Sequence, residues 1–467
     1  MEGNESVRAR HRFGSTGAGV LALVLAASLV AGCEADEGAV PPRDEPPRTA
    51  VDRTLTFAAF GPAPEVDAYR SLVSVYNSLY DDAEMEVVSY SSRQEFMGTM
   101  RESGEVPDVF LASGRDLKWL EDRQVLQPVD QLLLERGVDF GDLYSRDSVL
   151  AFSSESRLQC MPVGISPMVM FYNTELVDFD AMVRRGLSAP AEEGLSWNFA
   201  QFSAAAEFAS RPGRNTKGLY VDPSLEGLAP WIYSADGQLF DSSTEPTRLT
   251  FSDDSTLAAL ETVLPVLRDP RLTLTPAQLE RRSAVEWFER GKLAMMPGYR
   301  SLVPRLRDVP GLQFDVIQMP SVERNATVGE LTGMCVSAET RNTAAAADFL
   351  VHMASAVSVR RVASEGYLVP ANLEVAYSSD FIQPGRAPDH GQVFTNAIRT
   401  IVLPPLLDDE PELELTVADE LEELLLAPVL TDLEALATEI DEESRTILDP
   451  EGLAEEQSES PTGTESP

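Results

Sequence analysis

The chain has 467 residues, with 37 Lys and Arg against 76 Asp and Glu, and a formal net charge of −39. Such an acidic surface repels nucleic acid and anionic lipid, and no cluster of Lys and Arg offsets it, so we expect no nucleic-acid partner. Part of the acidity is local, because residues 408–467 carry 21 acidic residues against Arg445 alone.

The first 33 residues have the pattern of an export signal. Three arginines in residues 8–12 precede an uncharged run whose apolar core suits a signal peptide and is too short to span a bilayer. The run ends in Leu29-Val-Ala-Gly-Cys33, which resembles a bacterial lipobox. We predict that the mature protein begins at an acylated Cys33 and is anchored to the outer face of the cytoplasmic membrane. The alternative is an ordinary secretory signal with an incidental cysteine.

Two polar segments flank the part of the chain that we expect to fold. Residues 34–52 are rich in Pro, Glu, Asp and Arg without apolar periodicity, and they predict a flexible linker. Residues 449–467 are mostly Glu, Ser, Pro, Gly and Thr, and they predict a disordered acidic tail. About 400 residues lie between these segments, too many for one small core, so we predict two lobes.

The first folded segment alternates strands and helices. Strands are predicted over 55–60, 85–90 and 107–113, and helices over 65–80, over 93–102 and from the third strand through Trp119. The helix 65–80 carries apolar residues at spacings of three and four, which is typical of an amphipathic helix. Strand–helix repeats of this length favour an α/β fold with a mainly parallel sheet covered on both faces.

Longer elements follow in the rest of the chain. Extended runs are predicted over 161–173, 218–221, 293–296, 314–319 and 329–338, and helices over 199–210, 224–233, 252–268, 281–290 and 343–355. Ser196 or Asn198 is a candidate N-cap of the helix 199–210. Residues 391–448 have a helical pattern that Pro404-Pro405 and Pro411 interrupt.

Catalytic and metal-binding motifs are absent from the sequence. After the signal there are two histidines, His352 and His390, and no HExxH, GxSxG or CxxC pattern. We interpret His352 as a helical residue with a packing or surface role and His390 as a solvated loop residue. We predict no metal and no cofactor. A paired acid and base among the many carboxylates stays open, although no pair stands out.

Seven segments carry a family resemblance when they are read in order. They are Pro107–Pro128, Met161–Leu176, Ser196–Ser210, Trp231–Ser242, Phe288–Arg300, Gly329–Phe349 and Gly366–Pro370. Together they resemble the family 1 extracellular solute-binding proteins of ABC importers, the group that includes maltose-binding protein. No single segment is specific, but their joint order extends over residues 55–448.

The resemblance implies a two-lobe periplasmic-binding-protein fold of type II, with the lobes interleaved through crossing strands at a hinge. Lobe 1 would comprise 53–162 and 333–376, and lobe 2 would comprise 163–332 and 377–448. The protein would not be an enzyme. It would capture a sugar or oligosaccharide by hinge closure, deliver it to ABC permease subunits in the membrane, and act as a monomer.

The resemblance also places Cys160 and Cys335 close together, because the crossing strands of the family run side by side at the hinge. Export into an oxidising compartment permits a disulfide between them. Two independently buried thiols, packed as small hydrophobic residues, are the alternative.

The same resemblance implies a set of ligand-wall residues. They are Trp231, Tyr233, Tyr299 and Arg300 from lobe 2, Ser113, Arg115 and Tyr367 from lobe 1, and Ser166 and Glu330 near the crossings. Aromatic rings would cover the C–H faces of a sugar, and polar groups would bind its hydroxyls. Alternatively, Trp231 and Tyr233 pack a helix against the sheet, and Arg300 pairs with a carboxylate.

Three departures from the family pattern argue against a maltodextrin as the ligand. Gly298-Tyr299-Arg300 stands where the family has Gly-Pro-Trp, Glu330 places a charge on a crossing strand, and aromatic residues make up only 7 % of the chain. Sugar stays the most compatible class, with amino sugars, polyols and other small solutes open. An exported carbohydrate-active enzyme, which needs two positioned carboxylates, and a surface sensor or adhesin that keeps the fold are the competing functions.

Overall fold

The computed structural model describes residues 54–459, apart from residues 82, 139–142, 155, 192–195 and 408–409 and the side chains of residues 456–459. The predicted signal, its Cys33 and the linker 34–52 lie outside the described residues. Within the described ranges, no helix combines the length and the apolar character needed to cross a membrane.

A mixed sheet forms the centre of the first lobe. Its strands are β1 (Thr54–Phe60), β2 (Glu84–Tyr90), β3 (Val109–Ser113), β4 (Leu126–Gln127), β7 (Cys160–Pro167) and β11 (Gly329–Ser337). The order is β2-β1-β3-β11-β4, and β7 also pairs with β11. The predicted parallel pairing holds for β1, β2 and β3. The rest is antiparallel, because β11 enters the sheet from far along the chain instead of through a helical crossover.

Helices cover both faces of this sheet. They include α1 (Ala63–Leu79), α2 (Arg93–Ser103), α3 (Leu117–Asp122), α4 (Asp130–Leu134), α5 (Arg146–Ala151), α13 (Thr343–Ala354), α14 (Ala356–Ala363) and α15 (Leu373–Ala376). Phe57 of β1 packs against Phe349 of α13, with ring centroids 5.2 Å apart. Phe110 of β3 packs against Phe96 of α2 at 5.9 Å. Because Phe110 pairs with Ala58 and not with Phe57, the two aromatic pairs lie on opposite faces.

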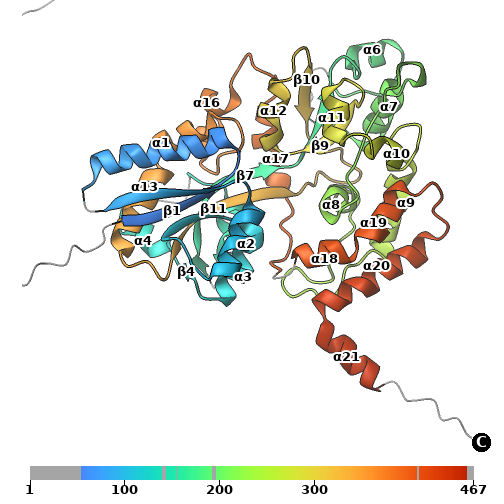
Figure 1. Cartoon of the computed structure of the whole chain (residues 1–467). Helices are drawn as coiled ribbons and strands as arrows, with labels where there is room; N and C mark the ends of the chain where they lie inside the picture. The colour runs from blue at the N-terminus through green and yellow to red at the C-terminus, as the bar shows by residue number, and fades with distance from the viewer. Residues whose placement is uncertain are drawn as a thin grey trace, which may run out of the picture. The chain divides into compact units, whose positions relative to one another are not determined.

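The second lobe contains a small antiparallel sheet and most of the remaining helices (Figure 1). The sheet has the order β10-β8-β9, with β8 (Val169–Asn173), β9 (Met295–Gly298) and β10 (Phe314–Ile317). The helices are α6 (Phe179–Arg184), α7 (Phe199–Ala209), α8 (Leu225–Ser234), α9 (Asp254–Leu267), α10 (Pro276–Leu279), α11 (Ala284–Glu289), α12 (Val303–Arg307), α17 (Gln392–Ala397), α18 (Glu410–Thr416), α19 (Ala418–Leu426) and α20 (Leu433–Leu448). The short helix α16 (Ser379–Ile382) packs instead against α14 and α15 of the first lobe.

Local sequence signals explain several element boundaries. Asn198, one of the two candidate caps, begins α7, since its side chain accepts a hydrogen bond from the backbone N–H of Gln201 and the Gln201 side chain accepts one in return. The predicted strand 218–221 forms a single isolated bridge, from Leu219 to Thr273. Residues 450–459 form the helix α21 (Pro450–Glu459) where the sequence predicted disorder, and residues 460–467 lie outside the described part.

Three segments connect the two lobes side by side. The first segment runs from β7 through Met168 into β8. The backbone N–H of Met168 donates to the carbonyl of Val328, which lies in the second segment just before β11, at 2.8 Å. The third segment contains Thr400 and Val402 and is bound to Thr327 of the second segment. The N–H of Thr327 donates to the carbonyl of Thr400 at 2.9 Å, and its carbonyl accepts from the N–H of Val402 at 2.8 Å. These backbone bonds hold the three connections in one fixed register at the hinge.

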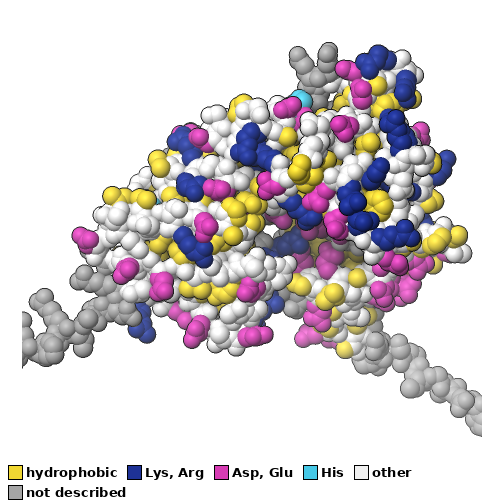
Figure 2. All heavy atoms as spheres, turned by 45° about the horizontal axis from the view of Figure 1, so that its top comes forward, with side chains coloured by type: hydrophobic (Ala, Val, Ile, Leu, Met, Phe, Trp, Pro, Cys, Tyr) yellow, Lys and Arg dark blue, Asp and Glu magenta, His cyan; other side chains and the backbone are white. Residues whose placement is uncertain are grey.

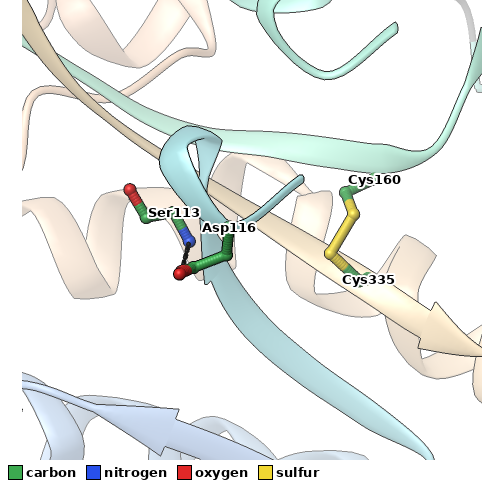
Figure 3. Close-up of a disulfide and its surroundings, with 4 residues drawn as sticks. All are labelled: Ser113, Asp116, Cys160 and Cys335. Atoms are coloured by element: carbon green, nitrogen blue, oxygen red, sulfur yellow. Dashed lines mark hydrogen bonds between the residues drawn. A yellow bond between two sulfur atoms is a disulfide. The ribbon is translucent and has the colours of Figure 1, made fainter. Parts of the chain in front are cut away.

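The paired strands β7 and β11 carry the two cysteines of the folded part. Cys160 and Cys335 face each other in the register, 4.3 Å apart at Cα, and are joined by a disulfide (Figure 3). The prediction that the two cysteines lie close together is confirmed, and they form a disulfide instead of two separate thiols. Because β7 and β11 stay paired as far as Pro167 and Gly329, the sheet of lobe 1 continues past the predicted boundaries at 162 and 333.

Candidate functional site

A cavity of about 180 Å³ lies where β3 ends and β11 begins, with walls from both lobes and from the connections between them. Polar and charged side chains in its wall are Arg115, Glu226, Tyr233, Glu410 and Glu414. Aliphatic and aromatic residues make up most of the remainder, including Leu150, Leu225, Ala229, Leu239, Phe240, Val328, Leu331, Leu403, Pro404, Pro405, Leu406, Leu407 and Leu413. Figure 2 shows a hollow near its centre, bordered by basic and acidic side chains. Sheets of this kind bind ligands at the carboxyl ends of their strands.

Arg115 is positioned by a short turn at the end of β3. The turn is the 3₁₀ helix Gly114–Asp116, which a capping box closes: the backbone N–H of Ser113 donates to the Asp116 carboxylate at 3.1 Å (Figure 3). Asp116 is buried, and Arg93 of α2 donates to it at 2.6 Å. Because the turn is fixed at both ends, the side chain of Arg115 is directed from lobe 1 into the cavity.

The guanidinium of Arg115 bridges the lobes. Its Nη2 lies 2.9 Å from Oε1 of Glu226, in the first turn of α8, and its Nη1 lies 3.1 Å from Oε1 of Glu410, the first residue of α18. The hydroxyl of Tyr299 donates to the same Oε1 of Glu226. Burial, and secondly the charge of Glu226, raise the pKa of Tyr299 well above its usual value, so this phenol is a neutral donor. Arg115 from lobe 1 and Tyr299 from lobe 2 therefore contact the same carboxylate, that of Glu226.

Negative charge exceeds positive charge at this site. A third carboxylate, Glu414, accepts a hydrogen bond from the backbone N–H of Leu225 at 3.3 Å. Burial raises the pKa of Glu410 and of Glu414, and Arg115 opposes the shift in both. In the described part of the cavity wall Arg115 is the one cation beside three carboxylates.

Two further carboxylates adjoin the cavity on the α1 side of the sheet. Glu330 lies between Gly329 and Leu331, which line the cavity, so strand alternation turns its side chain to the opposite face. Burial, and secondly the charge of Glu330, raise the pKa of Glu65 to about 8; burial, and secondly Glu226, raise that of Glu330 to about 7. Glu330 is exposed to solvent, which screens its charge, whereas Glu65 is half-buried.

A pH dependence of stability follows from the raised pKa of Glu65. Between about 4.3, the value in an unfolded chain, and about 8, the folded protein binds more protons than the unfolded chain. The free energy of unfolding should therefore fall as the pH rises from 5 to 8. Glu65→Gln should remove about 1–2 kcal/mol of this fall, a figure discounted for solvent screening.

Urea denaturation at pH 5 and pH 8 measures this effect. Glu84→Gln, which removes an exposed carboxylate on β2, is the matched control and should leave the pH dependence as it is. An identical pH dependence in Glu65→Gln and the wild type would contradict the assignment.

The structure brings together some of the residues implied by the family resemblance. Arg115 and Tyr233 line the cavity, Tyr299 joins it through Glu226, and Glu330 adjoins it. Ser113 caps the turn that carries Arg115. The remaining four residues lie outside the cavity wall.

Two of those four have roles in packing around the hinge. Ser166 is buried on β7, and its hydroxyl accepts a hydrogen bond from the backbone N–H of Val369 at 3.1 Å. Tyr367 is half-buried, and burial, then Asp308, then Glu65 raise its pKa. Tyr367 thus lies near the α1 side of the site without lining the cavity.

Trp231 and Arg300 lie away from the cavity. The residues Leu225, Glu226, Ala229 and Tyr233 form the cavity face of α8, and Trp231 projects from another face into the core, fully buried. The alternative of core packing is therefore the observed one for Trp231.

Arg300 is fully buried directly after Tyr299. Its guanidinium lies over the rings of Phe381 and Phe394, 4.8 and 5.4 Å from their centroids, and Nη2 donates to the Phe381 carbonyl at 3.2 Å. Burial, and then the charges of Arg307 and Arg386, lower the pKa of Arg300 to about 9. In place of the alternative carboxylate pairing, Arg300 contacts aromatic faces and a backbone carbonyl.

Sequence reasoning missed Glu226, Glu410 and the segment Leu403–Leu407. One signal existed for Glu226, a carboxylate in the first turn of a helix that begins after Ser224. The Pro404-Pro405 interruption was recognised, but not that the non-helical segment lines a cavity.

Comparison with known proteins agrees with this architecture. The family model of the bacterial extracellular solute-binding proteins matches residues 71–388. No curated protein matches the chain.

Several solved structures are similar to this chain. The ABC substrate-binding protein Lmo0181 from Listeria monocytogenes, in complex with cycloalternan, is 19 % identical, with a TM-score of 0.70 over 85 % of this chain and 98 % of that chain. The sugar-binding protein MalE of Xanthomonas citri is 15 % identical, with a TM-score of 0.71 over 86 % and 99 %. The GacH receptor of Streptomyces glaucescens is 19 % identical, with a TM-score of 0.67 over 85 % and 98 %. The predicted two-lobe binding-protein fold is thereby confirmed.

Proposed function

Since the chain belongs to the bacterial extracellular solute-binding proteins, we propose that it captures a sugar or oligosaccharide between its lobes and delivers it to the permease of an ABC importer. The observation that carries the proposal is a cavity walled by both lobes and bridged by Arg115. Solved proteins of similar fold hold cycloalternan and acarbose, which supports sugar as the class of solute.

The size and position of the cavity suit this role. A volume of about 180 Å³ has room for roughly a dozen water-sized groups, comparable to a sugar ring with its hydroxyls. The wall combines apolar surface for C–H groups with a few charged hydrogen-bonding groups at one end. Because the two lobes meet at Arg115, a hinge motion that separates them would open the cavity and break the Arg115 ion pairs.

The competing enzyme function is less well supported by the cavity. Glycoside hydrolysis needs one carboxyl that holds a proton and a second that acts as nucleophile or base. Glu226 and Glu410 are both held in ion pairs by the guanidinium of Arg115, so neither carboxyl group is free to act on a glycosidic bond while these contacts are kept. We therefore propose binding without turnover.

We also propose that the mature protein is a monomer held at the membrane by acylated Cys33. The family is extracellular, and an importer component without an anchor would diffuse away from its permease. Mass spectrometry of the mature N-terminus tests this directly, and an unmodified Cys33 or a different N-terminal residue would contradict it.

The function is tested by thermal unfolding of the purified protein with a library of mono- and oligosaccharides. A matched solute at 100 times its dissociation constant should stabilise the protein by about 2.7 kcal/mol, and the solute should be recovered unchanged. In Tyr299→Ala, affinity for that solute should fall by at least ~1 kcal/mol, because the hydrogen-bond donor that positions the Glu226 carboxylate in the cavity wall is lost.

Tyr377→Ala is the matched control, since Tyr377 is 57 % exposed and does not line the cavity. Calorimetry should show the same affinity for this control and the wild type. Consumption of the saccharide would indicate an enzyme. Equal affinities of Tyr299→Ala and the wild type would place the solute elsewhere.

A further inference from the structure

Carboxylates outnumber cations around the cavity, and the cations are already paired. Arg115 is already engaged, because its two terminal nitrogens are bound to Glu226 and Glu410. Arg93, the next arginine on this side of the sheet, is bound to the buried Asp116. The cations that the described structure places at this site are thus neutralised before any solute enters.

Glu330 and Glu65, by contrast, have no cation partner. Neither carboxylate has a hydrogen bond or ion pair with another described residue, although the charge of Glu330 acts on Glu65, and the charges of Glu226 and Arg115 act on Glu330. They come from the start of β11 and from the first turn of α1, which follows β1, so both lie at the edge of the sheet that faces the cavity. The two carboxyl groups that adjoin the cavity are therefore without a cation in contact in the described part of the chain.

A buried hydroxyl beside these carboxylates is also without a partner. Tyr69 lies one turn after Glu65 on the same face of α1 and is 1 % exposed, and its hydroxyl makes no hydrogen bond with the described residues. Glu65 is close enough that its charge, after burial, raises the pKa of Tyr69. An unpartnered polar atom in such a buried position costs free energy unless a further group satisfies it.

We propose that the captured solute carries a positively charged amine, which reaches past the start of β11 to Glu330 and Glu65 while the ring lies against the apolar wall of the cavity. The inference rests on the proposed function and narrows its substrate class to amine-bearing saccharides. An ammonium group has three donors and no acceptor, which suits a cluster of acceptors. A neutral hydroxyl supplies no positive charge to favour the ionised carboxylates, and an anionic sugar meets repulsion from the carboxylates around the cavity.

Matched solutes test the charge independently of the sugar ring. Calorimetry at constant ionic strength compares D-glucosamine with D-glucose and N-acetyl-D-glucosamine, and deacetylated chitosan oligosaccharides with chitin and cellulose oligosaccharides, at a pH at which the amines are protonated. The better-bound amine should bind about tenfold more tightly than its neutral counterparts, the difference expected for one charge-assisted contact.

Two variants assign this preference to the site. Glu330→Gln should reduce the ratio of amine to neutral affinity at least about threefold, whereas Glu84→Gln, which removes an equal charge on the exposed part of β2, should keep the ratio. A Glu330→Gln protein with the wild-type ratio would overturn the assignment.

The possible failures can be told apart. Neutral saccharides that bind as tightly as the amines would overturn the charge inference and leave the proposed function in place. Stabilisation by simple diamines, with none by any saccharide, would overturn the sugar class. Stabilisation by calcium chloride alone would identify the carboxylates as a metal site and overturn the inference.

Discussion

Loss of the disulfide between Cys160 and Cys335 should lower the free energy of unfolding by about 2–5 kcal/mol. The two cysteines are 175 residues apart in the sequence, so the bond closes a long loop and restricts the unfolded chain strongly. It also joins the two strands that carry the chain between the lobes. Urea denaturation of Cys160→Ala/Cys335→Ala and of the wild type, both without reductant, measures the loss.

Reductant separates this effect from packing changes at the two positions. It should lower the melting temperature of the wild type toward that of the double variant and leave the variant unaffected. The cysteines do not line the cavity, so binding by the folded variant provides a second readout. A wild-type melting temperature that does not respond to reductant under unfolding conditions would contradict the prediction.

The regular elements of the fold could be predicted from the sequence because their signals are local. The predicted helices 65–80, 224–233 and 252–268 differ from α1, α8 and α9 by at most two residues at either end. Apolar spacing and turn residues determine where these helices begin and end, and both signals depend only on neighbouring residues. The antiparallel position of β11 depends on pairing with strands more than 150 residues earlier, which no local pattern encodes.

The candidate site was predictable where a residue's role follows from its place at the end of a strand. Arg115 follows β3 and Glu330 begins β11, and both reach the edge of the sheet that faces the cavity. Arg300 could not be placed in this way. The sequence predicted Arg300 in the ligand wall or paired with a carboxylate, and only the approach of Phe381 and Phe394 from another part of the chain explains its burial.

Trp231→Ala should lower the free energy of unfolding by about 3–5 kcal/mol, the cost of removing a large aromatic side chain from a core. Trp231 is fully buried, and its ring centroid lies 5.0 Å from that of Phe202 and 6.0 Å from that of Phe199. The indole N–H has no hydrogen-bond partner among the described residues. Trp231→Phe, which keeps most of the ring contacts and removes this donor, should therefore cost much less.

Tyr233→Ala is the informative companion variant, because Tyr233 lies two residues farther along α8 and lines the cavity. Urea denaturation and calorimetry with the matched solute should separate the two positions. Trp231→Phe should keep its affinity, since the ring it alters faces the core, whereas Tyr233→Ala should lose affinity because it removes part of the cavity wall. If the Trp231→Ala protein kept wild-type stability and lost affinity, the indole would have to contact the ligand, and α8 would have to be rotated from its position here.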